Sequence, residues 1–216
     1  MEVFYSKKEL YKEVAVIKKW LKLKSINPQL DLVELVANNY CELEKLPFKT
    51  EGLRGISIIG NENSSDIIML NNKRTLFEQN YDCGHEIMHL LLHRNLDQKT
   101  FNCFDHCKAN QNPFLEWQAN EGAAEFFLPY RYLLHIIDKC RNYLTSYSEL
   151  CRFKQALSKS LCIPEAVVTF RLENLKYEIY QYLSGTDIDD IEILSARKQE
   201  ELGISVQSLN QILSPF

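Results

Sequence analysis

The pattern His-Glu-x-x-His occurs at His85, Glu86 and His89 of this sequence. On a helix, residues four positions apart lie on one face and about 6 Å apart along the axis, so both imidazoles can bind the same metal ion. The glutamate beside the first histidine is then placed to take a proton from water that the metal polarises. The pattern therefore predicts a helix over residues 75–93 that carries two histidine ligands and a general base.

The next histidine in the chain is a candidate for a further ligand. A catalytic zinc ion usually has three protein ligands, so the first two histidines leave one to be found. His93 continues the series of histidines four residues apart, but on a straight helix it lies about 12 Å from His85. The three leucines at 90–92 give the helix no reason to bend. We therefore expect His93 to lie at the helix end or against a ligand rather than on the ion.

A second helix, expected over residues 113–128, supplies the carboxylates that can complete the site. Its small residues allow it to pack closely on the first helix, as a shared metal site requires. Glu116 is the favoured third ligand because Asn120 follows it by one turn and can hold a ligand histidine by a hydrogen bond. Glu121 and Glu125 remain alternative ligands, since spacing alone ranks Glu116 only modestly ahead of them.

The other patterns predict an α+β fold, in which a small antiparallel sheet packs on helices and a helical C-terminal portion follows. Ser6 and Glu9 form a capping box at the start of the first helix. Two β-branched runs separated by a polar turn are typical of a hairpin. The remaining expected elements are helices over 6–24 and 30–40, strands over 55–60 and 66–71, a polar loop over about 95–112, two or three helices over 130–182, and one weak helix after Gly185.

Charge and composition argue against several classes of protein. The net charge of −4, from 25 basic and 29 acidic residues, is unlike that of a protein built mainly to coat nucleic acid. No run approaches the roughly 18 apolar residues of a membrane span, and the first residues lack the apolar core of a signal peptide. The seven cysteines are irregularly spaced, which is typical of reduced thiols. We therefore expect a cytoplasmic protein with no membrane association.

The two motifs together resemble the ImmA/IrrE family of bacterial and phage metallopeptidases. The resemblance rests on residues 85–93 and on Glu-Trp-Gln-Ala-Asn at 116–120 followed by Phe-Phe-Leu-Pro at 126–129, and it covers roughly residues 30–176. The family's third zinc ligand, the first glutamate of the second motif, falls on Glu116. The resemblance implies a cytosolic zinc endopeptidase with one zinc ion per chain. It also implies that the substrate is a helix–turn–helix repressor or another regulatory protein of a mobile element or stress response.

The resemblance further implies a zincin-like peptidase domain, expected over residues 1–136, with residues 137–216 as a helical portion packed on it. Three segments depart from the family pattern. These are residues 82–84 before the first motif, residues 103–107 between the motifs, and the tail after Ser184. None of the three contains an expected ligand, so they leave the predicted site intact.

The expected reaction is hydrolysis of a peptide bond, in which Glu86 takes a proton from water and passes it to the leaving amine. The tetrahedral oxyanion needs a hydrogen-bond donor besides the metal. Candidates for this donor lie just beyond the helix that carries Glu116, although each can equally be a packing or surface residue. They are Tyr130, Arg131, Tyr132 and His135.

Two other functions fit parts of the sequence. Residues 150–176 can form a DNA-binding helix–turn–helix, but the basic residues are few and acidic ones dilute them. The chain can also be a metal-binding interaction protein without catalysis, such as half of a toxin–antitoxin or repressor pair. We expect a protein substrate rather than DNA as the partner. The basic residues of the DNA-binding alternative are Arg152, Lys154, Lys159, Arg171 and Lys176.

Four residues outside the expected site can also bind a metal or react. Cys103, His106 and Cys107 can form a small structural metal site, but the spacing is unfamiliar and a fourth ligand is not evident. Cys83, two residues before His85, can act as an inhibitory or redox-sensing thiolate. Ordinary reduced thiols are the alternative in both cases.

Overall fold

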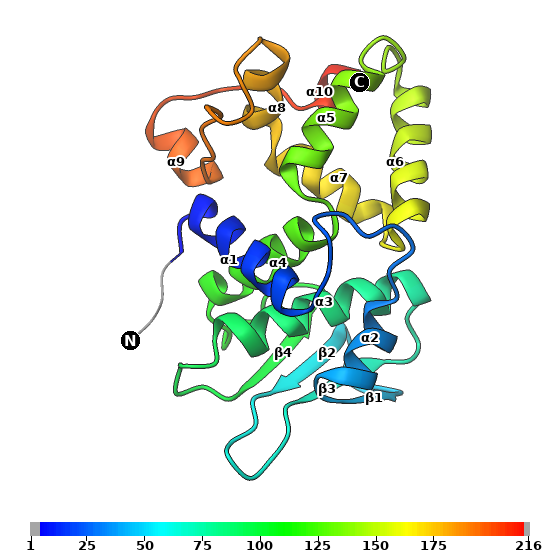
Figure 1. Cartoon of the computed structure of the whole chain (residues 1–216), viewed down its shortest axis with the longest axis vertical. Coiled ribbons are helices and arrows are strands. Elements are labelled where there is room, and N and C mark those ends of the chain that lie inside the picture. The colour runs from blue at the N-terminus through cyan, green and yellow to red at the C-terminus, as the bar shows by residue number, and fades with distance from the viewer. Residues whose placement is uncertain (1–4, 214–216) are drawn as a thin grey trace.

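The computed structural model describes residues 5–213 of the chain. Four strands form one sheet at one end of the molecule, and helix α3 (Leu76–Leu92) lies across one of its faces (Figure 1). The strands are β1 (Glu42–Leu46), β2 (Leu53–Ile58), β3 (Ile67–Asn71) and β4 (Thr100–Phe104), in the order β1-β3-β2-β4. β2 pairs antiparallel with β3 and β4, whereas β1 pairs parallel with β3, so the sheet is mixed rather than antiparallel.

The structure confirms the predicted hairpin as β2 and β3, and it adds β1 and β4, which the sequence patterns do not predict. β4 lies in the segment expected to be a polar loop, so that expectation is wrong for residues 100–104. Only Phe101 and Cys103 of β4 are buried, which leaves too short an alternation to stand out among polar neighbours. β1 is a short edge strand with mostly exposed side chains, and it carries no stronger signal.

Two helices precede the sheet in the chain, α1 (Lys7–Trp20) and α2 (Leu32–Asn39), as the sequence predicts. The Ser6 hydroxyl accepts a hydrogen bond from the backbone N–H of Glu9, whose carboxylate accepts one from the backbone N–H of Ser6. This is the expected capping box. Asp31 caps α2 by accepting a backbone N–H of its first turn.

The motif helix α3 and the helix predicted to complete its site pack closely on each other. Thr75 and Glu78 form the capping box that starts α3. α4 (Pro113–Phe127) has proline in its first turn, where the missing N–H costs no helical hydrogen bond. A Cβ on Gly84 would come within 2.6 Å of the Phe127 ring, so glycine at this position lets the ring pack directly on α3.

Helices make up the rest of the described chain and form the other end of the molecule (Figure 1). The segment 130–182 contains four helices rather than two or three, and the tail contains two short helices rather than one. One of the unpredicted breaks falls at Leu175 alone, where no proline or glycine marks it. These helices are α5 (Tyr130–Cys140), α6 (Tyr147–Leu161), α7 (Glu165–Asn174), α8 (Lys176–Leu183), α9 (Ala196–Glu201) and α10 (Leu209–Leu213).

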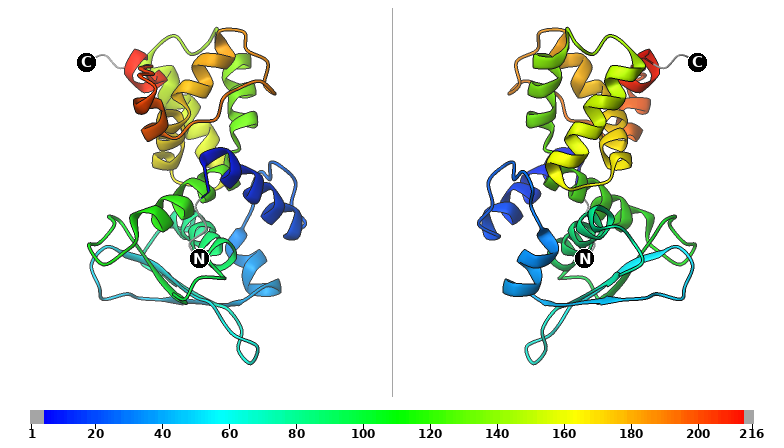
Figure 2. Two further views of the ribbon diagram at one scale, coloured as in Figure 1. Left: turned by 90° about the vertical axis from the view of Figure 1, so that its left-hand side faces the viewer. Right: turned by 90° about the vertical axis from the view of Figure 1, so that its right-hand side faces the viewer.

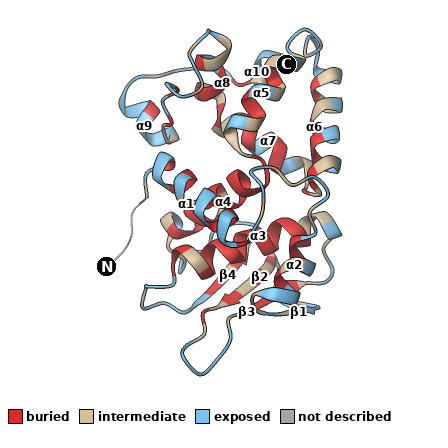
Figure 3. Cartoon of the chain, in the orientation of Figure 1, coloured by how far each residue is buried: buried red, intermediate tan, exposed pale blue. Residues whose placement is uncertain are grey.

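The α+β class is confirmed, and the side views show the described helices on one side of the sheet (Figure 2). One cluster of buried apolar side chains extends from α1 to Ile193. α3 and α4 are buried along most of their length, so side chains on them face the interior (Figure 3). The boundary expected at residue 136 falls within α5, and the division into a peptidase domain and a helical portion stays a prediction. No described helix is both long and apolar enough to cross a membrane.

Candidate metal centre

His85 and His89 lie one turn apart on α3, and Glu116 on the first turn of α4 faces them. The Nε2 atoms of the two histidines are 3.0 Å apart. The Glu116 carboxylate lies 3.5 Å from Nε2 of His85 and 3.6 Å from Nε2 of His89. The ligand atoms of the three residues lie within 4.8 Å of one another. The structure therefore brings together the three residues predicted as metal ligands.

The charge state of these three side chains suits a metal cation. Burial lowers the pKa of both histidines, and that of His89 falls to about 4, so the imidazoles are neutral near pH 7. Burial opposes the ionisation of Glu116, but its contacts with the two histidines outweigh burial and lower its pKa to about 2. Two neutral imidazoles and one carboxylate are the donor set of many catalytic zinc sites. These residues therefore fit a divalent metal such as zinc.

Asn120 holds His85 in the orientation that a metal requires. The side-chain Nδ2 of Asn120 donates a hydrogen bond to the backbone oxygen of Glu116, 2.9 Å away. Its Oδ1 is therefore free to accept a hydrogen bond from Nδ1 of His85 at 3.1 Å. Because Nδ1 carries the proton, Nε2 keeps the lone pair that faces the other ligands.

A chain of hydrogen bonds through His93 orients His89 in the same way. Oε1 of Gln118 accepts a hydrogen bond from Nε2 of His93 at 2.8 Å. Nδ1 of His93 then has no proton, and it accepts a hydrogen bond from Nδ1 of His89 at 2.9 Å. His89 thus keeps its Nε2 lone pair for a metal. The sequence patterns do not identify Gln118, because this contact depends on how α4 is rotated against α3.

The carboxylate of Glu86 is fully buried, and neither of its oxygen atoms has a hydrogen-bond partner among the described residues. Burial raises its pKa well above the ordinary value; the buried Ser57 hydroxyl of β2 opposes this rise, and the nearby Glu116 carboxylate adds to it. Glu86 lies directly under β2, where a Cβ on Gly55 would come within 2.5 Å of Oε1. A buried polar group without a partner costs roughly 1–3 kcal/mol. A cation held by the adjacent histidines, together with its water, would supply that partner.

A cleft of about 440 Å³ lies beside the ligand Glu116 and its neighbour Asn120. Tyr81, one turn before His85 on α3, lines this cleft, and its hydroxyl donates a hydrogen bond to the backbone oxygen of Asn120 at 3.1 Å. Any molecule in the cleft would meet aromatic rings and the Glu116 side chain. The aromatic side chains of the cleft are Tyr81, Phe104, Trp117 and Phe170.

The four side chains expected to stabilise an oxyanion all lie on α5. Tyr130 stacks on Tyr11 with ring centroids 5.6 Å apart, and its hydroxyl accepts a hydrogen bond from Arg131. Tyr132 is half-buried against the core, and His135 is exposed on α5. None of these four expected donors lines the cleft found in the described chain. Their role as oxyanion donors therefore stays a prediction.

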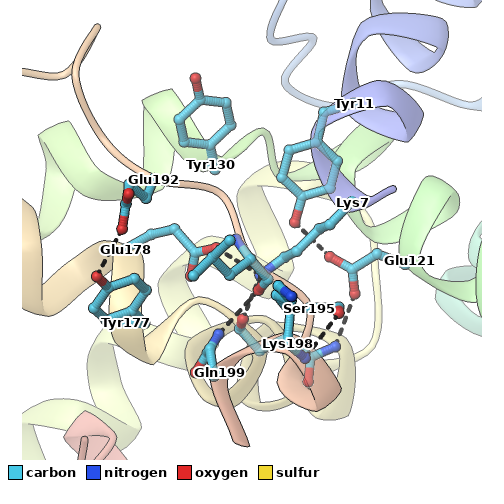
Figure 4. Close-up of polar contacts among 12 residues, drawn as sticks. Lys7, Tyr11, Glu121, Tyr130, Tyr177, Glu178, Glu192, Ser195, Lys198 and Gln199 are labelled. Carbon is cyan, nitrogen blue, oxygen red and sulfur yellow. Dashed lines mark hydrogen bonds and ion pairs between the residues drawn. The ribbon is translucent and has the colours of Figure 1, made fainter. Parts of the chain in front are cut away.

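Glu121 and Glu125, the alternative ligands, belong to a second buried cluster on α4. Arg171 of α7 is fully buried and forms ion pairs with both carboxylates, 2.6 Å from that of Glu121. Figure 4 shows Tyr11 and Glu121 turned toward each other, with Lys7 close by. Neither glutamate belongs to a group of metal ligands in the described chain. Of the three glutamates considered as the third ligand, Glu116 is the one that the structure places in a group with both histidines.

Asp82, three residues before His85, joins the motif helix to the sheet. Its buried carboxylate forms ion pairs with Arg54 of β2 and, at 2.6 Å, with Arg74 just before α3. Both arginines also line the cleft. The departure from the family pattern at Asp82 therefore adds an ion-paired group beside the cleft and leaves the ligands unchanged.

The structure separates the three residues considered for a second, structural metal site. Cys103 is buried on β4, whereas His106 and Cys107 are exposed beyond it. Within the described chain these three residues do not form a group of metal ligands. Cys103 instead lies beside His85 and Glu86, and the ligand atoms of those three residues are within 4.8 Å of one another.

A protein-family model described as Peptidase M78, the IrrE N-terminal-like domain, matches residues 41–173. The matched region contains the whole sheet, both helices of the metal centre and most of α7. This match confirms the resemblance indicated by the two sequence motifs. A comparison with curated proteins finds no significant match.

Proposed function

The chain belongs to the IrrE N-terminal-like family of peptidases, and on this basis we propose that it is a zinc-dependent endopeptidase that hydrolyses a peptide bond in a protein substrate. The observation that carries this proposal is the arrangement around Glu86. A buried carboxylate without a hydrogen-bond partner lies next to two neutral imidazoles and a second carboxylate whose ligand atoms converge. Such an arrangement suits a cation with water beside it better than it suits a closed hydrophobic core.

His85, His89 and Glu116 would hold one zinc ion per chain. Their nitrogen and oxygen donors favour zinc, and three protein ligands leave one position open, as in other catalytic zinc sites. When bound, zinc lowers the pKa of water and polarises the carbonyl of the peptide bond that is cut. Asn120 and His93 keep the two imidazoles in the tautomer that presents Nε2.

Glu86 is the residue that moves the proton. It accepts a proton from the attacking water at a carboxylate oxygen and then donates that proton to the nitrogen of the leaving amine. A raised pKa, caused by burial, suits a carboxylate that must hold a proton between these two steps. Gly55 supports this role because any side chain there would occupy the space of the Glu86 carboxylate.

A regulatory protein of the repressor type is the substrate that we propose, and family resemblance supports it. The aromatic walls of the cleft suit a segment with large apolar side chains, such as the core-facing residues of a small helical domain. The cysteines of the described chain are free thiols, which supports a reducing, cytoplasmic compartment.

Direct DNA binding has little support from the basic residues of the helix–turn–helix alternative. Arg171 is fully buried in ion pairs with glutamates, and Lys154 is buried against Asn210. Arg152 and Lys159 are exposed but are too few for a phosphate-binding surface. We propose that the partner is a protein rather than DNA. Salt-sensitive binding of the purified chain to duplex DNA would contradict this.

The Glu86→Gln variant tests the proposed enzyme. Glutamine has almost the same shape, so the variant keeps its zinc, but it cannot carry the proton, and cleavage falls by roughly 10²–10⁴-fold. We would measure bound zinc by elemental analysis. Mass spectrometry would measure cleavage of a purified helix–turn–helix repressor, sought first among the products of neighbouring genes. Glu192→Gln is the matched control, because this exposed carboxylate accepts a hydrogen bond from Tyr177 far from the motif in sequence. This variant should keep its zinc and its cleavage rate.

Cleavage at the wild-type rate by Glu86→Gln would overturn the mechanism. If a variant that no longer cleaves still changes expression of the genes under the repressor as the wild type does, the alternative of a metal-binding interaction protein without catalysis is favoured instead.

A further inference from the structure

Cys103 lies on β4 directly over the motif helix. The two buried side chains of this strand are Phe101 and Cys103, which share one face because they are two residues apart. Phe101 stacks on the imidazole of His89, with ring centroids 4.5 Å apart and planes at 16°. Two residues along a strand and one turn of a helix span similar lengths, about 6–7 Å and 5.4 Å. The same register therefore places Cys103 one turn earlier, over His85 and Glu86, where its Sγ lies within 4.8 Å of their ligand atoms.

The neighbouring strand β2 turns two small residues, Gly55 and Ser57, toward this space, and the buried Ser57 hydroxyl acts on the Glu86 carboxylate. Cys103 pairs in register with Gly55 of β2, which has no side chain to place over α3. Glu86 lies beneath this pair, fully buried and without a hydrogen-bond partner in the described chain. A thiol and an unpartnered carboxylate thus lie close together beside His85.

His85 belongs to both groups of converging ligands, one with His89 and Glu116 and one with Glu86 and Cys103. Its Nδ1 is engaged by Asn120, so Nε2 is left to bind a metal, and an ion at that atom would lie next to both groups. Cys103 does not converge with His89 and Glu116 in one group, so its side chain would have to turn toward such an ion. A thiolate is among the strongest protein ligands of zinc and commonly completes four-coordinate sites.

We propose that Cys103 is the fourth ligand of the zinc ion in the resting protein, and that it closes the coordination position that the attacking water needs. This inference rests on the zinc peptidase function proposed above and adds its regulation. On binding, the Cys103 thiol loses its proton to solvent and a zinc–sulfur bond forms. On activation, water replaces the sulfur, which takes a proton back from solvent, and no electron is transferred.

The other cysteines near the centre serve as matched controls. Cys83 lies two residues before His85 but is buried in the apolar core and belongs to neither group of ligands. Cys107 lines the cleft and is exposed. Replacing either by serine should leave the metal ligands unchanged.

X-ray absorption spectroscopy at the zinc edge tests the proposal on the full-length protein loaded with zinc in reducing buffer. The wild type, Cys83→Ser and Cys107→Ser should each show one sulfur ligand at about 2.3 Å beside nitrogen and oxygen ligands at about 2.0–2.2 Å. Cys103→Ser should bind one zinc ion without any sulfur ligand. With cobalt in place of zinc, the thiolate-to-metal charge-transfer band should be present in the first three proteins and absent in the last.

Only nitrogen and oxygen ligands in the wild type would overturn the proposal, and this result needs no variant to fold. A sulfur ligand that persists in Cys103→Ser would overturn it too, because the sulfur would come from another cysteine. If the wild type binds zinc through nitrogen and oxygen ligands alone, the Cys103 proposal fails but the proposed peptidase function does not. If the wild type binds no zinc, both the Cys103 proposal and the zinc peptidase proposal fail. His89→Ala, which should lose the metal, shows that the spectra report this centre.

Discussion

Helix α4 contributes carboxylates to two buried clusters, and the comparison shows how a side chain's role depends on its counter-charge. Glu121 and Glu125 face the guanidinium of Arg171, so the chain itself supplies their positive partner. Glu116 faces two imidazoles that burial keeps neutral, next to Glu86, which has no partner in the described chain. In the first cluster the carboxylates of α4 are ion-paired with Arg171 of α7, so the two helices are held together without any further ion. The second lacks positive charge, which a metal ion would supply.

The largest expected effect on stability comes from removing Arg171, the positive partner of Glu121 and Glu125. Arg171→Met leaves two buried carboxylates without their cation, and the free energy of unfolding should fall by about 3–5 kcal/mol. Urea unfolding followed by circular dichroism measures this change. The folded fraction should still bind one zinc ion, because Arg171 contacts no ligand of the metal centre.

Arg131→Met is the matched control for that loss. Arg131 pairs with Asp189 at 2.6 Å, but both side chains are exposed, so this change should cost less than about 1 kcal/mol. Equal losses in the two variants would contradict the view that burial makes the Arg171 cluster essential.

A smaller effect is expected from the residue that orients a ligand. His93→Ala removes the acceptor of the His89 Nδ1 proton, and zinc affinity should fall about 10–100-fold while the stoichiometry stays at one. Competition with a zinc chelator measures the affinity. His135→Ala, at an exposed histidine on α5, should leave the affinity unchanged. Wild-type affinity in the His93 variant would show that the hydrogen-bond chain does not hold the ligand.

The smallest effect is a difference in pH dependence between the two clusters. Burial lowers the pKa of His89 and His93 to about 4, so the unfolded chain binds more protons than the folded chain between pH 4 and 6.5. Stability of the metal-free protein should therefore rise with pH across this window. Burial raises the pKa of Glu125 to about 7, which makes stability fall as pH rises from about 4.5 to 7.

These opposite slopes can be separated by variants. Glu125→Gln should make the rise in stability between pH 4.5 and 6.5 steeper than in the wild type, and His93→Ala should make it shallower. Urea unfolding of the metal-free proteins at several pH values measures both slopes. Parallel curves for all three proteins would mean that these groups titrate alike in the folded and unfolded states.

Local patterns allowed much of this structure to be predicted. A capping box marked the start of α1 and a proline that of α4, and the spacing of His85 and His89 placed them on one helix face. Glu116 was favoured because Asn120 follows it by one turn. These features depend on neighbours within a few residues, which is why a sequence reports them.

Contacts between distant segments were harder to predict. Arg171 was considered as a phosphate contact because it is basic, yet it is fully buried between helices that are far apart in the chain. Tyr130 and His135 follow Glu116 closely in sequence but lie away from the cleft. Cys103 lies at the metal centre only because β4 adds to the edge of the sheet, and no local pattern predicts that strand.

The central claim is that Glu116 completes a metal site with His85 and His89, while Glu121 completes an ion pair. Zinc titration of the wild type, Glu116→Ala and Glu121→Gln tests it most directly. The wild type and Glu121→Gln should each bind one zinc ion with similar affinity, and Glu116→Ala should bind it at least about 100-fold more weakly, since a direct ligand outweighs an orienting residue. Wild-type zinc binding by Glu116→Ala, or its loss in Glu121→Gln alone, would contradict the account.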